Sequence, residues 1–259
     1  MTALASPFDA LAGAYDATFT HTDLGLRLRS AVWRHLDAAF APTARVLELG
    51  CGTGEDALHL ASRGVQVVAT DASAAMVDET ARKARQAGYD SLVTARVLAF
   101  EELSGAEVSL GPFDGAFSDF GAVNCASGLD AVAGVLGRLL VPGAPLLLVV
   151  MGRYVPWEWA WFLRRAAPAQ AFRRLARGGV TWRGLTVRYP TPRRLASAFS
   201  PWFRRRKLVA LGALLPPSYA AASVAPRMMG FLYRWERRLE GAAPFAWLAD
   251  HYLLAMERR

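Results

Sequence analysis

Cysteine is scarce in this chain, and its scarcity excludes two common ways of stabilising a fold. The 259 residues include only two cysteines, Cys51 and Cys125. Two cysteines cannot build a disulfide framework and argue against a cysteine-based zinc site, as expected in a reducing compartment. The first residues also lack a basic region followed by an apolar run, so no secretory signal is predicted. We therefore expect a cytoplasmic protein without a bound metal.

Long uncharged segments are also few, and the one to test as a membrane span is residues 208–226. Its 19 residues are interrupted by Gly212, Pro216 and Pro217. A spanning helix needs about 20 mostly apolar residues. The segment is therefore predicted to be a buried strand followed by a loop that lines a pocket, while peripheral contact with a membrane surface stays open.

Lysine is nearly absent, and acidic residues are missing from one region. Only two of the 30 basic residues are lysines, and the formal net charge is +8. Residues 1–152 carry 10 basic and 17 acidic side chains, residues 153–207 carry 14 basic side chains and only Glu158, and residues 208–259 carry six and four. The middle segment is therefore predicted to be a separate functional layer. Three interpretations of its arginines stay open: a solvated face, a surface that attracts an acidic small molecule or an anionic membrane, or an RNA-binding surface.

The apolar pattern predicts a doubly wound α/β fold. Short runs rich in Val and Leu are expected to be strands, at 45–49, 65–69, 93–98, 113–118 and 144–151. Helical patterns lie between them at 55–62, 73–87 and 129–140. Strands that alternate with helices form βαβ units and a parallel sheet. Two more strands are predicted at 204–214 and 251–258.

Segments on either side of this core are predicted to cover the site. Residues 8–19 and 24–40 look like two helices that form a lid over the carboxyl edge of the sheet. The predicted cap, 153–207, contains a helix at 156–177, a hairpin at 180–189 and a short helix at 192–199. The predicted division is therefore a core with its lid at 1–152, the cap at 153–207, and completion of the sheet at 208–259, with a helix at 227–240.

The strongest functional pattern is VLELGCGTG at residues 46–54, which leaves a strand and enters a helix. Gly50, Gly52 and Gly54 allow a tight turn and let backbone groups approach a ligand closely. A dinucleotide site would place a glycine at the sixth position of G-x-G-x-x-G, where this chain has Glu55. An acid on the first helical turn repels a pyrophosphate but not a cationic sulfonium. The pattern therefore favours an adenosyl amino acid.

Two carboxylates flank the glycine turn in positions that suit such a ligand. Glu48, just before the turn, can reach the amino group of an amino-acid moiety directly or through water. Asp71, at the end of the next strand, can accept hydrogen bonds from both ribose hydroxyls. The alternative for Asp71 is that it only caps the following helix.

At this point the sequence resembles the class I S-adenosylmethionine (SAM) dependent methyltransferases. The matching segments are VLELGCGTG, VVATDASAAMVDETARKA, FDGAFSDF at 113–120 and LLVPGAPLLLVV at 139–150. FDALAGAYDATF at 8–19 is similar to the N-terminus of the small-molecule branch, which includes quinone-biosynthesis methyltransferases. The resemblance covers about residues 8–151. It implies a Rossmann-like, mostly parallel sheet of seven strands with an antiparallel last strand, and SAM as cofactor with S-adenosylhomocysteine (SAH) as product.

The resemblance also implies which residues hold SAM. They are Tyr15, Glu48, Gly50, Cys51, Gly52, Thr53, Gly54, Asp71, Ala72, Met76, Phe100, Glu101 and Ser118. The chain departs from the family pattern after the third strand, where an acid usually reads the adenine amino group and this chain has Ala99 and Phe100. Either Glu101 takes that role, or Phe100 packs on the ring and backbone groups read its edge.

Catalytic and acceptor residues are less sharply marked. Methyl transfer mainly requires alignment of the acceptor with the methyl group, and a base helps only if the acceptor must lose a proton. The candidates for catalysis are Tyr15, His21 and Asp119, with Tyr15 closing over the methyl-donor end and His21 the one histidine in a loop near the site. The candidates for acceptor binding are Phe120, Asn124, Arg153, Tyr154 and Trp157, although Asn124 could cap a helix and the aromatic rings could only pack the cap on the sheet.

Three functions remain in view. The first is SAM-dependent O-, N- or C-methylation of a small, largely apolar or aromatic metabolite by a monomer or homodimer. The second is RNA methylation through the basic segment, which the repeated arginines at helical spacing and the general use of Arg for Lys argue against. The third is a non-catalytic module that binds SAM or a nucleoside.

Overall fold

The structure, a computed structural model, describes residues 6–259, with only the backbone at residues 107–109. A seven-stranded sheet has the order β3-β2-β1-β4-β5-β9-β8. Its strands are β1 (Arg45–Leu49), β2 (Gln66–Asp71), β3 (Val93–Val97), β4 (Gly115–Ser118), β5 (Pro145–Met151), β8 (Phe203–Leu211) and β9 (His251–Arg258). β1 to β5 are parallel, and β9 runs antiparallel to both β5 and β8. The predicted fold class, including the antiparallel last strand, is confirmed.

Helices connect the strands and cover both faces of the sheet. They are α1 (Ala12–Tyr15), α2 (Asp23–Ala39), α3 (Glu55–Ala61), α4 (Ala74–Ala87), α5 (Leu103–Leu110), α6 (Ala122–Cys125), α7 (Leu129–Leu139), α8 (Pro156–Leu163), α9 (Pro168–Ala171), α10 (Pro192–Phe199), α11 (Ser218–Ala221), α12 (Pro226–Leu239) and α13 (Ala243–Leu248). Short 3-10 turns lie at Asp9–Leu11, Phe100–Glu102 and Arg173–Leu175, and a π-helical turn at Asp16–Thr20. A separate two-stranded hairpin consists of β6 (Val180–Trp182) and β7 (Leu185–Val187).

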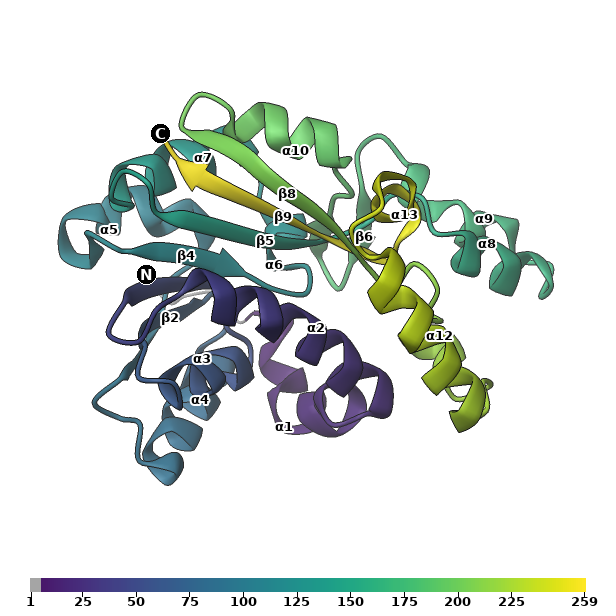
Figure 1. Ribbon diagram of the computed structural model, residues 1–259, viewed down its shortest axis with the longest axis horizontal. Helices are drawn as coiled ribbons and strands as arrows, with labels where there is room; N and C mark the ends of the chain where they lie inside the picture. The colour runs from purple at the N-terminus through teal and green to yellow at the C-terminus, as the bar shows by residue number, and fades with distance from the viewer. Residues whose placement is uncertain (1–5) are drawn as a thin grey trace.

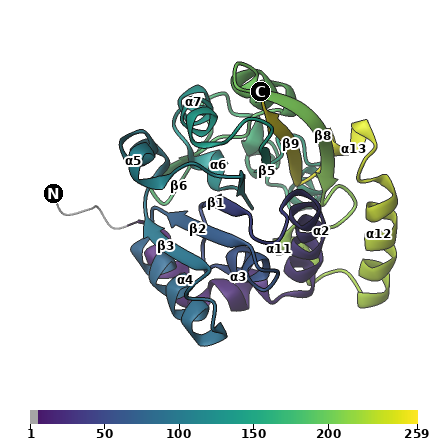
Figure 2. The same cartoon turned by 60° about the vertical axis from the view of Figure 1, so that its left-hand side comes forward.

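Two apolar layers follow from the alternation of side chains along the strands. On one face, Leu146 and Leu148 of β5 pack with α5, α7 and α10, and on the other face Leu147 and Val149 pack with α2 and α3. Successive side chains of a strand point to opposite faces, so the continuous apolar run of β5 is buried on both sides. Figure 2 shows the sheet between these two groups of helices.

Local signals end the helices where the sequence predicts. The Ser73 hydroxyl accepts a hydrogen bond from the Met76 N–H at the start of α4, at 3.2 Å, and Gly88 ends that helix in the left-handed conformation. These are the N-cap and C-cap geometries expected of serine and glycine. They fix where β2 ends and α4 begins, which is where Asp71 lies.

The cap differs from the prediction in two ways. The helix expected at 156–177 breaks into α8, α9 and a 3-10 turn, because Ala166 has a positive φ of 54° and Pro168 starts a new helix. Residues 192–207, predicted as part of the cap, lie with the core: α10 buries Leu195 and Phe199 in the main apolar cluster, and β8 pairs with β9. The sequence reading also missed α5 and α13.

The cap and the C-terminal helices lie beyond the end of the sheet. Figure 1 shows α8, α9 and α12 projecting on one side of the strands, while α1 and α2 lie below β4 and β5. Within the described part of the chain, no helix has the length and apolar character needed to cross a bilayer.

Candidate active site

A cavity of about 750 Å³ lies at the carboxyl ends of the parallel strands, where open α/β sheets bind ligands. It is lined by the glycine turn, the ends of β2 and β3, the turn after β4, the N-terminal segment and the hairpin. The lining includes Phe8, Tyr15, Gly50, Gly52, Asp71, Ala72, Met76, Phe100, Glu101, Asp119, Phe120, Met151, Arg173, Val180, Trp182, Leu185, Val187 and Tyr189. The topology thus brings together residues more than 170 positions apart in the chain.

The glycine turn has the conformation that only glycine adopts easily. Gly50, Gly52 and Gly54 have φ values of 74°, 53° and 83°. A Cβ on Gly50 would come within 2.2 Å of the Ala122 Cβ, and one on Gly54 within 2.7 Å of Thr80. Gly52 has nothing within 4 Å of that position and borders the cavity. Gly50 and Gly54 are therefore required by packing, and Gly52 leaves room beside its backbone for close approach of a ligand, while its own N–H and C=O bond to Asp71 and Thr80.

Asp71 is held in place by backbone groups on both sides. Its Oδ1 accepts from the Ser73 N–H at 2.8 Å, and its Oδ2 accepts from the Gly52 N–H at 3.0 Å. Burial raises the pKa of Asp71 above its ordinary value, although these two N–H groups oppose the shift. The carboxylate therefore links the glycine turn to the start of α4 and presents its remaining lone pairs to the cavity.

Four charged side chains are buried together beside the glycine turn. Arg29 of α2 donates to the Asp56 carboxylate, which also accepts from the Trp33 indole N–H at 2.6 Å. Glu48 is 1% exposed and Asp119 is 6% exposed. Neither Asp119 oxygen nor the Glu48 Oε2 has a hydrogen-bond partner among the described residues. Two buried carboxylates thus lack the donors that buried acids normally have.

The electrostatics of this group follow from burial and from the neighbouring acids. Burial, together with the charge of Asp56, raises the pKa of Glu48 and the pKa of Asp119 well above their ordinary values. Arg29 opposes both shifts but is itself paired with Asp56. Only Asp119 borders the cavity. A cationic ligand group at this point would therefore meet Asp119 first, with Glu48 deeper in the protein.

Asp119 leads into a strained turn. Phe120 has a positive φ of 46°, which is rare for a bulky residue, and Gly121 follows at 100°. The Phe120 ring packs against Phe19 at 5.5 Å between centroids and lies under the Arg29 guanidinium at 5.0 Å. Packing therefore holds the backbone in a conformation that directs Asp119 and Phe120 into the cavity.

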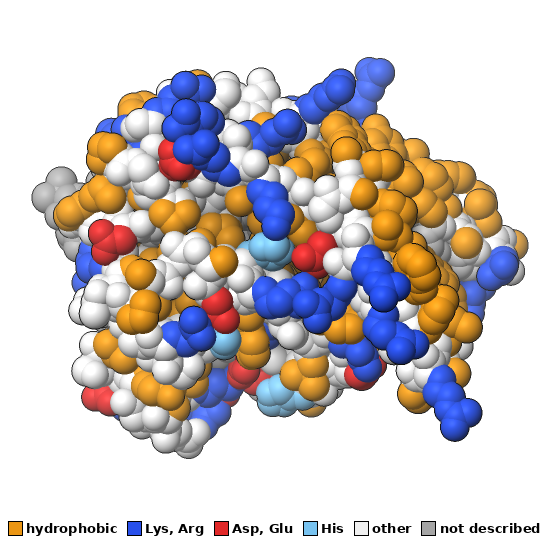
Figure 3. Space-filling model, in the orientation of Figure 1, with side chains coloured by type: hydrophobic (Ala, Val, Ile, Leu, Met, Phe, Trp, Pro, Cys, Tyr) orange, Lys and Arg blue, Asp and Glu red, His pale blue; other side chains and the backbone are white. Residues whose placement is uncertain are grey.

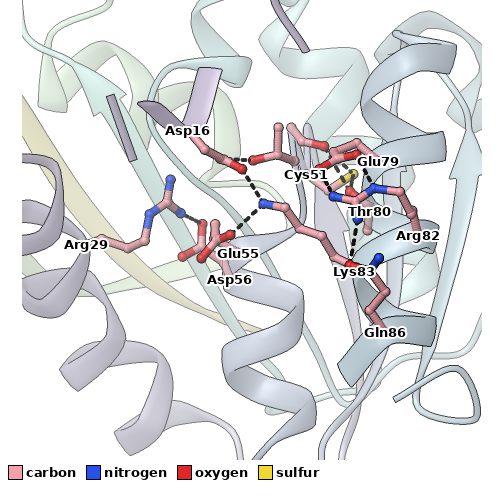
Figure 4. Close-up of polar contacts among 12 residues, drawn as sticks. Asp16, Arg29, Cys51, Glu55, Asp56, Glu79, Thr80, Arg82, Lys83 and Gln86 are labelled. Atoms are coloured by element: carbon pink, nitrogen blue, oxygen red, sulfur yellow. Dashed lines mark hydrogen bonds and ion pairs between the residues drawn. The ribbon is translucent and has the colours of Figure 1, made fainter. Parts of the chain in front are cut away.

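The N-terminal segment is fastened over the site from two sides. The Asp9 carboxylate accepts from the Ser73 hydroxyl at 2.5 Å. Asp16 accepts from the Thr53 hydroxyl at 2.6 Å and pairs with Lys83, which also pairs with Glu55 (Figure 4). Burial alone would raise the pKa of Asp16, but hydrogen bonds from Lys83 and Thr53 lower it. The first part of the predicted lid is thus fastened over the glycine turn, and Lys83 joins it to the first turn of α3. The second predicted lid helix, α2, instead packs on one face of the sheet.

This contact corrects one argument from the sequence. Glu55 was expected to repel a pyrophosphate, but its charge is compensated by Lys83 at 2.6 Å. The acids that face the cavity are Asp71, Asp119 and Glu101. The preference for a cationic over an anionic ligand therefore depends on these residues rather than on Glu55.

The structure brings most of the expected cofactor residues to the cavity but leaves five of them outside its lining. Glu48 lies behind the lining, and the Ser118 hydroxyl donates to the Leu49 carbonyl at 2.7 Å. Cys51 is buried beside Thr80, and burial raises the pKa of its thiol, as expected of a packed side chain. Thr53 contacts the lid and Gly54 contacts Thr80, so both shape the site without lining it.

After the carboxyl end of β3, Phe100 and Glu101 both line the cavity, with Leu98, Ala99 and Leu103. Glu101 is exposed, and its carboxylate accepts from the Ser127 hydroxyl at 2.8 Å. Both Glu101 and Phe100, the two alternatives drawn from the sequence for reading the adenine edge, therefore remain candidates, and both lie on this wall of the cavity.

His21 does not reach the cavity. It is exposed at the end of the π-helical turn, near Asp16 and Glu55. The ligand atoms of these three residues lie within 4.8 Å of one another, but Lys83 already pairs with both carboxylates. No histidine or lysine lines the cavity within the described chain. The proposal of His21 as a base is therefore not supported by its position.

Four of the five expected acceptor residues also lie elsewhere, and only Phe120 lines the cavity. Asn124 is fully buried: its Nδ2 donates to the carbonyls of Met151 and Arg188, at 3.3 and 2.6 Å, and its Oδ1 accepts from the Met151 N–H at 2.9 Å. It therefore fastens the hairpin to the sheet. Trp157 donates to the Leu214 carbonyl, and Arg153 and Tyr154 border smaller cavities.

Several residues of the site carried no signal in the sequence. Arg29 lies in the predicted lid helix 24–40 and Asp56 in the helix after the glycine turn, and neither was singled out, while Trp182, Leu185 and Val187 were only part of a predicted hairpin. The apolar side chains of these hairpin residues line the cavity, and Trp182 packs against Phe8 at 5.3 Å between centroids. The alternation of Leu185 and Val187 along a strand was the one pattern that indicated a shared face.

Comparison with known proteins agrees with this geometry. Residues 46–143, less than half of the chain, match a family model described as a methyltransferase domain. The chain is 35% identical over 159 residues to a demethylmenaquinone methyltransferase of Beutenbergia cavernae, which covers 60% of each protein. It is also 33% identical over 85 residues to a tRNA 5-carboxymethoxyuridine methyltransferase of Escherichia coli K12. This second alignment covers 31% of this chain and 33% of that protein. The chain thus spans about three fifths of the first relative and a third of the second.

A solved structure shows the same fold over nearly the whole chain. The geranyl diphosphate C-methyltransferase of Streptomyces coelicolor A3(2), in complex with Mg²⁺, geranyl diphosphate and SAH, superposes with a TM-score of 0.59. The alignment covers 98% of this chain and 84% of that protein at 15% identity. The match of residues 46–143 to a methyltransferase domain agrees with the predicted resemblance, and the superposition shows that the chain has the fold of this solved methyltransferase.

The residues present fit SAM. Two buried carboxylates without partners suit an ammonium group, the open side of Gly52 leaves room for close approach, and Asp71 has free lone pairs for ribose hydroxyls. The apolar wall formed by Ala72, Met76, Leu98 and Phe100 suits a flat heterocycle.

Proposed function

We propose that the protein transfers a methyl group from SAM to a small, largely apolar or aromatic metabolite held between the core and the hairpin. The observation that carries this proposal is that one cavity joins the acid-flanked glycine turn to an apolar wall of Phe8, Trp182, Leu185 and Val187. Its volume of about 750 Å³ is within the range of small-molecule sites.

The residues of this chain would act mainly by binding and alignment. Bound SAM supplies an electrophilic methyl group on a sulfonium, and SAH is the product. Asp71 would hold the ribose, the backbone at Gly50 and Gly52 the amino-acid portion, and Asp119 the amino group. Phe120 and Tyr15 flank the space between donor and acceptor. Holding two reactants in near-attack geometry supplies a large part of such a rate enhancement.

Proton removal has few candidates in this site. Within the described chain the titratable side chains that line the cavity are Tyr15, Asp71, Glu101, Asp119, Cys125, Arg173 and Tyr189. Burial raises the pKa of Asp119, which makes this carboxylate a better proton acceptor than an ordinary aspartate, but it also faces the amino-group position. The lining therefore supports an acceptor that needs little or no help from a base, such as a nitrogen or an activated carbon.

The test combines ligand binding with product formation. We expect calorimetric titration to show binding of SAM and SAH and no binding of NAD. We then expect SAH to form when SAM and the protein are incubated with the low-molecular-mass filtrate of a cell extract, and not with purified RNA. Binding of NAD in preference to SAM would contradict the assignment of the glycine turn, and SAH formed only with RNA would favour the RNA methyltransferase.

The observed positions of the arginines favour the small-molecule acceptor. Arg204 and Arg206, which an RNA methyltransferase would use to contact RNA, lie on the edge strand β8 and pair with Glu257 of the neighbouring strand β9. The cavity opposite the glycine turn is lined by apolar side chains, with Arg173 its one basic residue among those described. An RNA site would instead present a basic groove with stacking platforms.

We also propose that one face of the molecule contacts an anionic membrane surface. Figure 3 shows apolar side chains gathered over the region of α8, α9 and α12, with basic side chains along the border. Met228, Phe231 and Trp235 are spaced along α12 and are 41–51% exposed, and Arg227, Arg234 and Arg238 lie on the same helix. Exposed aliphatic and aromatic side chains flanked by arginines are typical of interfacial helices.

Vesicle sedimentation tests this contact. We expect binding to phosphatidylglycerol vesicles and much weaker binding to phosphatidylcholine vesicles. Phe231→Ser/Trp235→Ser should lose most of that binding, and Val97→Ser, at an equally exposed apolar position on β3, should keep it. If the double variant instead abolishes a concentration-dependent dimer, the face is an interface between two copies, and the membrane proposal is wrong.

A further inference from the structure

Two smaller cavities, with volumes of about 500 and 440 Å³, adjoin the large one at Tyr189. Both are lined by Arg153, Arg177, Tyr189 and Arg194, and the larger also by Arg188. Val187 lines the large cavity and Arg188 the neighbouring one, as expected for consecutive residues of an extended segment. The basic side chains thus border cavities that share Tyr189 with the apolar site.

The four guanidinium groups come from four segments of the chain. Arg153 follows β5, Arg177 lies in the turn before β6, Arg188 follows β7, and Arg194 is in the first turn of α10. Their convergence therefore depends on the tertiary fold and is not a run of basic residues in the sequence. Arg153 is fixed in direction, since its Nη2 donates to the Leu175 carbonyl at 2.5 Å.

These arginines lack acidic partners. Among the residues that the structure describes, none of the four has a carboxylate within ion-pair distance. The one acid that lines either cavity is Asp130, which is exposed. By contrast, Arg173 and Arg174, a few residues away, are paired with the buried Glu158. Four like charges around one hollow repel one another unless an anion lies between them.

The start of α10 also favours an anion. This helix begins at Pro192, directly after Thr191, which lines the smaller cavity. Pro192 has no N–H and the Arg194 N–H is capped by the Thr191 hydroxyl at 3.3 Å, so the helix contributes mainly the partial positive charge of its N-terminus. Guanidinium groups bind phosphate oxygens through paired N–H donors, and several of them together match a multiply charged group better than a single carboxylate.

We propose that Arg153, Arg177, Arg188 and Arg194 form a binding site for a phosphate monoester or diphosphate group of a small molecule. Tyr189 borders all three cavities, so a ligand held by these arginines lies against the wall of the large cavity. The site does not depend on methyl transfer, and its occupancy is measurable without SAM.

Calorimetric titration of the full-length protein with inorganic pyrophosphate tests the proposal. We expect saturable binding of one equivalent, competed by inorganic phosphate. The double variant Arg177→Gln/Arg194→Gln should bind pyrophosphate at least tenfold more weakly, because two of the four charges are lost. Both side chains are exposed and make no described side-chain contact, so the fold should be kept. The matched control is Arg164→Gln/Arg205→Gln, which removes two exposed arginines that line none of the three cavities.

The outcomes separate a site from diffuse surface charge. Loss of pyrophosphate binding in the cavity variant, with retention in the control, supports the site. Equal weakening in both variants, no binding to the unmodified protein, or equally tight binding of malonate would overturn it, the last because the site would then select carboxylates. SAM titration of the same variants should give an unchanged affinity, so that a failure of the methyltransferase proposal is seen separately.

Discussion

The two sides of the large cavity are built on different physical principles. On the cofactor side, Gly50, Gly52 and Asp71 are placed by the ends of adjacent parallel strands. On the hairpin side, Trp182 packs against Phe8, and Asn124 donates to the carbonyl of Arg188, so this side depends on residues far away in the chain. Backbone geometry determines the first side, and individual side-chain contacts determine the second.

Charge separates the two regions as well. Residues 1–152 carry an excess of acids, whereas between residues 153 and 239 the only acids are Glu158 and Glu236. Both are buried and bonded within the fold, Glu158 to Arg174 and Glu236 to the N–H groups of Ala213 and Leu214. The exposed surface of this second region is therefore basic or neutral. The cofactor side of the large cavity suits a cation, and the two smaller cavities lined by arginines suit an anion.

The largest expected effect is on the cofactor side, where one side chain makes several contacts. Asp71→Ala removes the acceptor for the Gly52 and Ser73 N–H groups and the proposed ribose contacts. We expect SAM affinity to fall by about 100-fold, equivalent to about 3 kcal/mol. Calorimetric titration with SAM measures the change.

The control for this variant is on α4, the helix that follows Asp71. Asp78→Ala removes an exposed carboxylate of α4 that is remote from the cavity, and it should leave SAM affinity unchanged. Both variants should keep the circular dichroism spectrum of the native protein. An Asp71→Ala protein that binds SAM as tightly as the native one would show that the glycine turn alone holds the ligand.

The next effect tests how the hairpin is attached. Asn124→Ala removes three hydrogen bonds between buried groups and leaves the Met151 N–H and the carbonyls of Met151 and Arg188 without their partner. We expect a loss of about 2–4 kcal/mol in the free energy of unfolding, measured by urea denaturation. Ser127→Ala, at an exposed position three residues on, should lose much less. Limited proteolysis should cut the Asn124→Ala protein within residues 177–187, and an equal rate of cleavage in both variants would contradict the role of Asn124.

The difference between local backbone geometry and distant side-chain contacts explains which features could be predicted from the sequence. The strands, their parallel order and the positions of Gly52 and Asp71 follow from apolar periodicity and turn residues, which act over a few positions. Pro168 was the local signal for the break between α8 and α9, and it was read as part of one helix.

The rest depends on tertiary contacts that no local pattern encodes. Asn124 was read as a ligand contact because it follows the carboxyl edge of β4, yet its amide is consumed by the backbone of distant segments. Arg29 lies on α2, and only the tertiary fold brings it to Asp56 and Phe120. The strained φ of Phe120 likewise results from packing around it.

A moderate effect should appear in the pH dependence of cofactor binding. Because the pKa of Asp119 is raised, this carboxylate takes up a proton at a higher pH than an ordinary aspartate. Only its charged form attracts the amino group of SAM, so affinity should rise with pH through the raised pKa, above the ordinary range of aspartate, by up to about tenfold. Asp119→Asn should show the low-pH affinity throughout. A native protein with no such slope, or a variant with the native slope, would contradict the role of Asp119.

The smallest expected effect is on the lid, which connects the two sides of the comparison. Lys83 joins Asp16 of the lid to Glu55 of α3, and all three side chains are less than a quarter exposed (Figure 4). Lys83→Met should loosen the lid without touching the cavity, and we expect SAM to dissociate about threefold to tenfold faster, measured by stopped-flow fluorescence. The control on the same helix is Arg82→Gln, which breaks an exposed pair with Glu79 and should leave the dissociation rate unchanged. If both variants release SAM at the native rate, the lid is held by Asp9 and Ser73 at its other end, and the Lys83 contact only stabilises the fold.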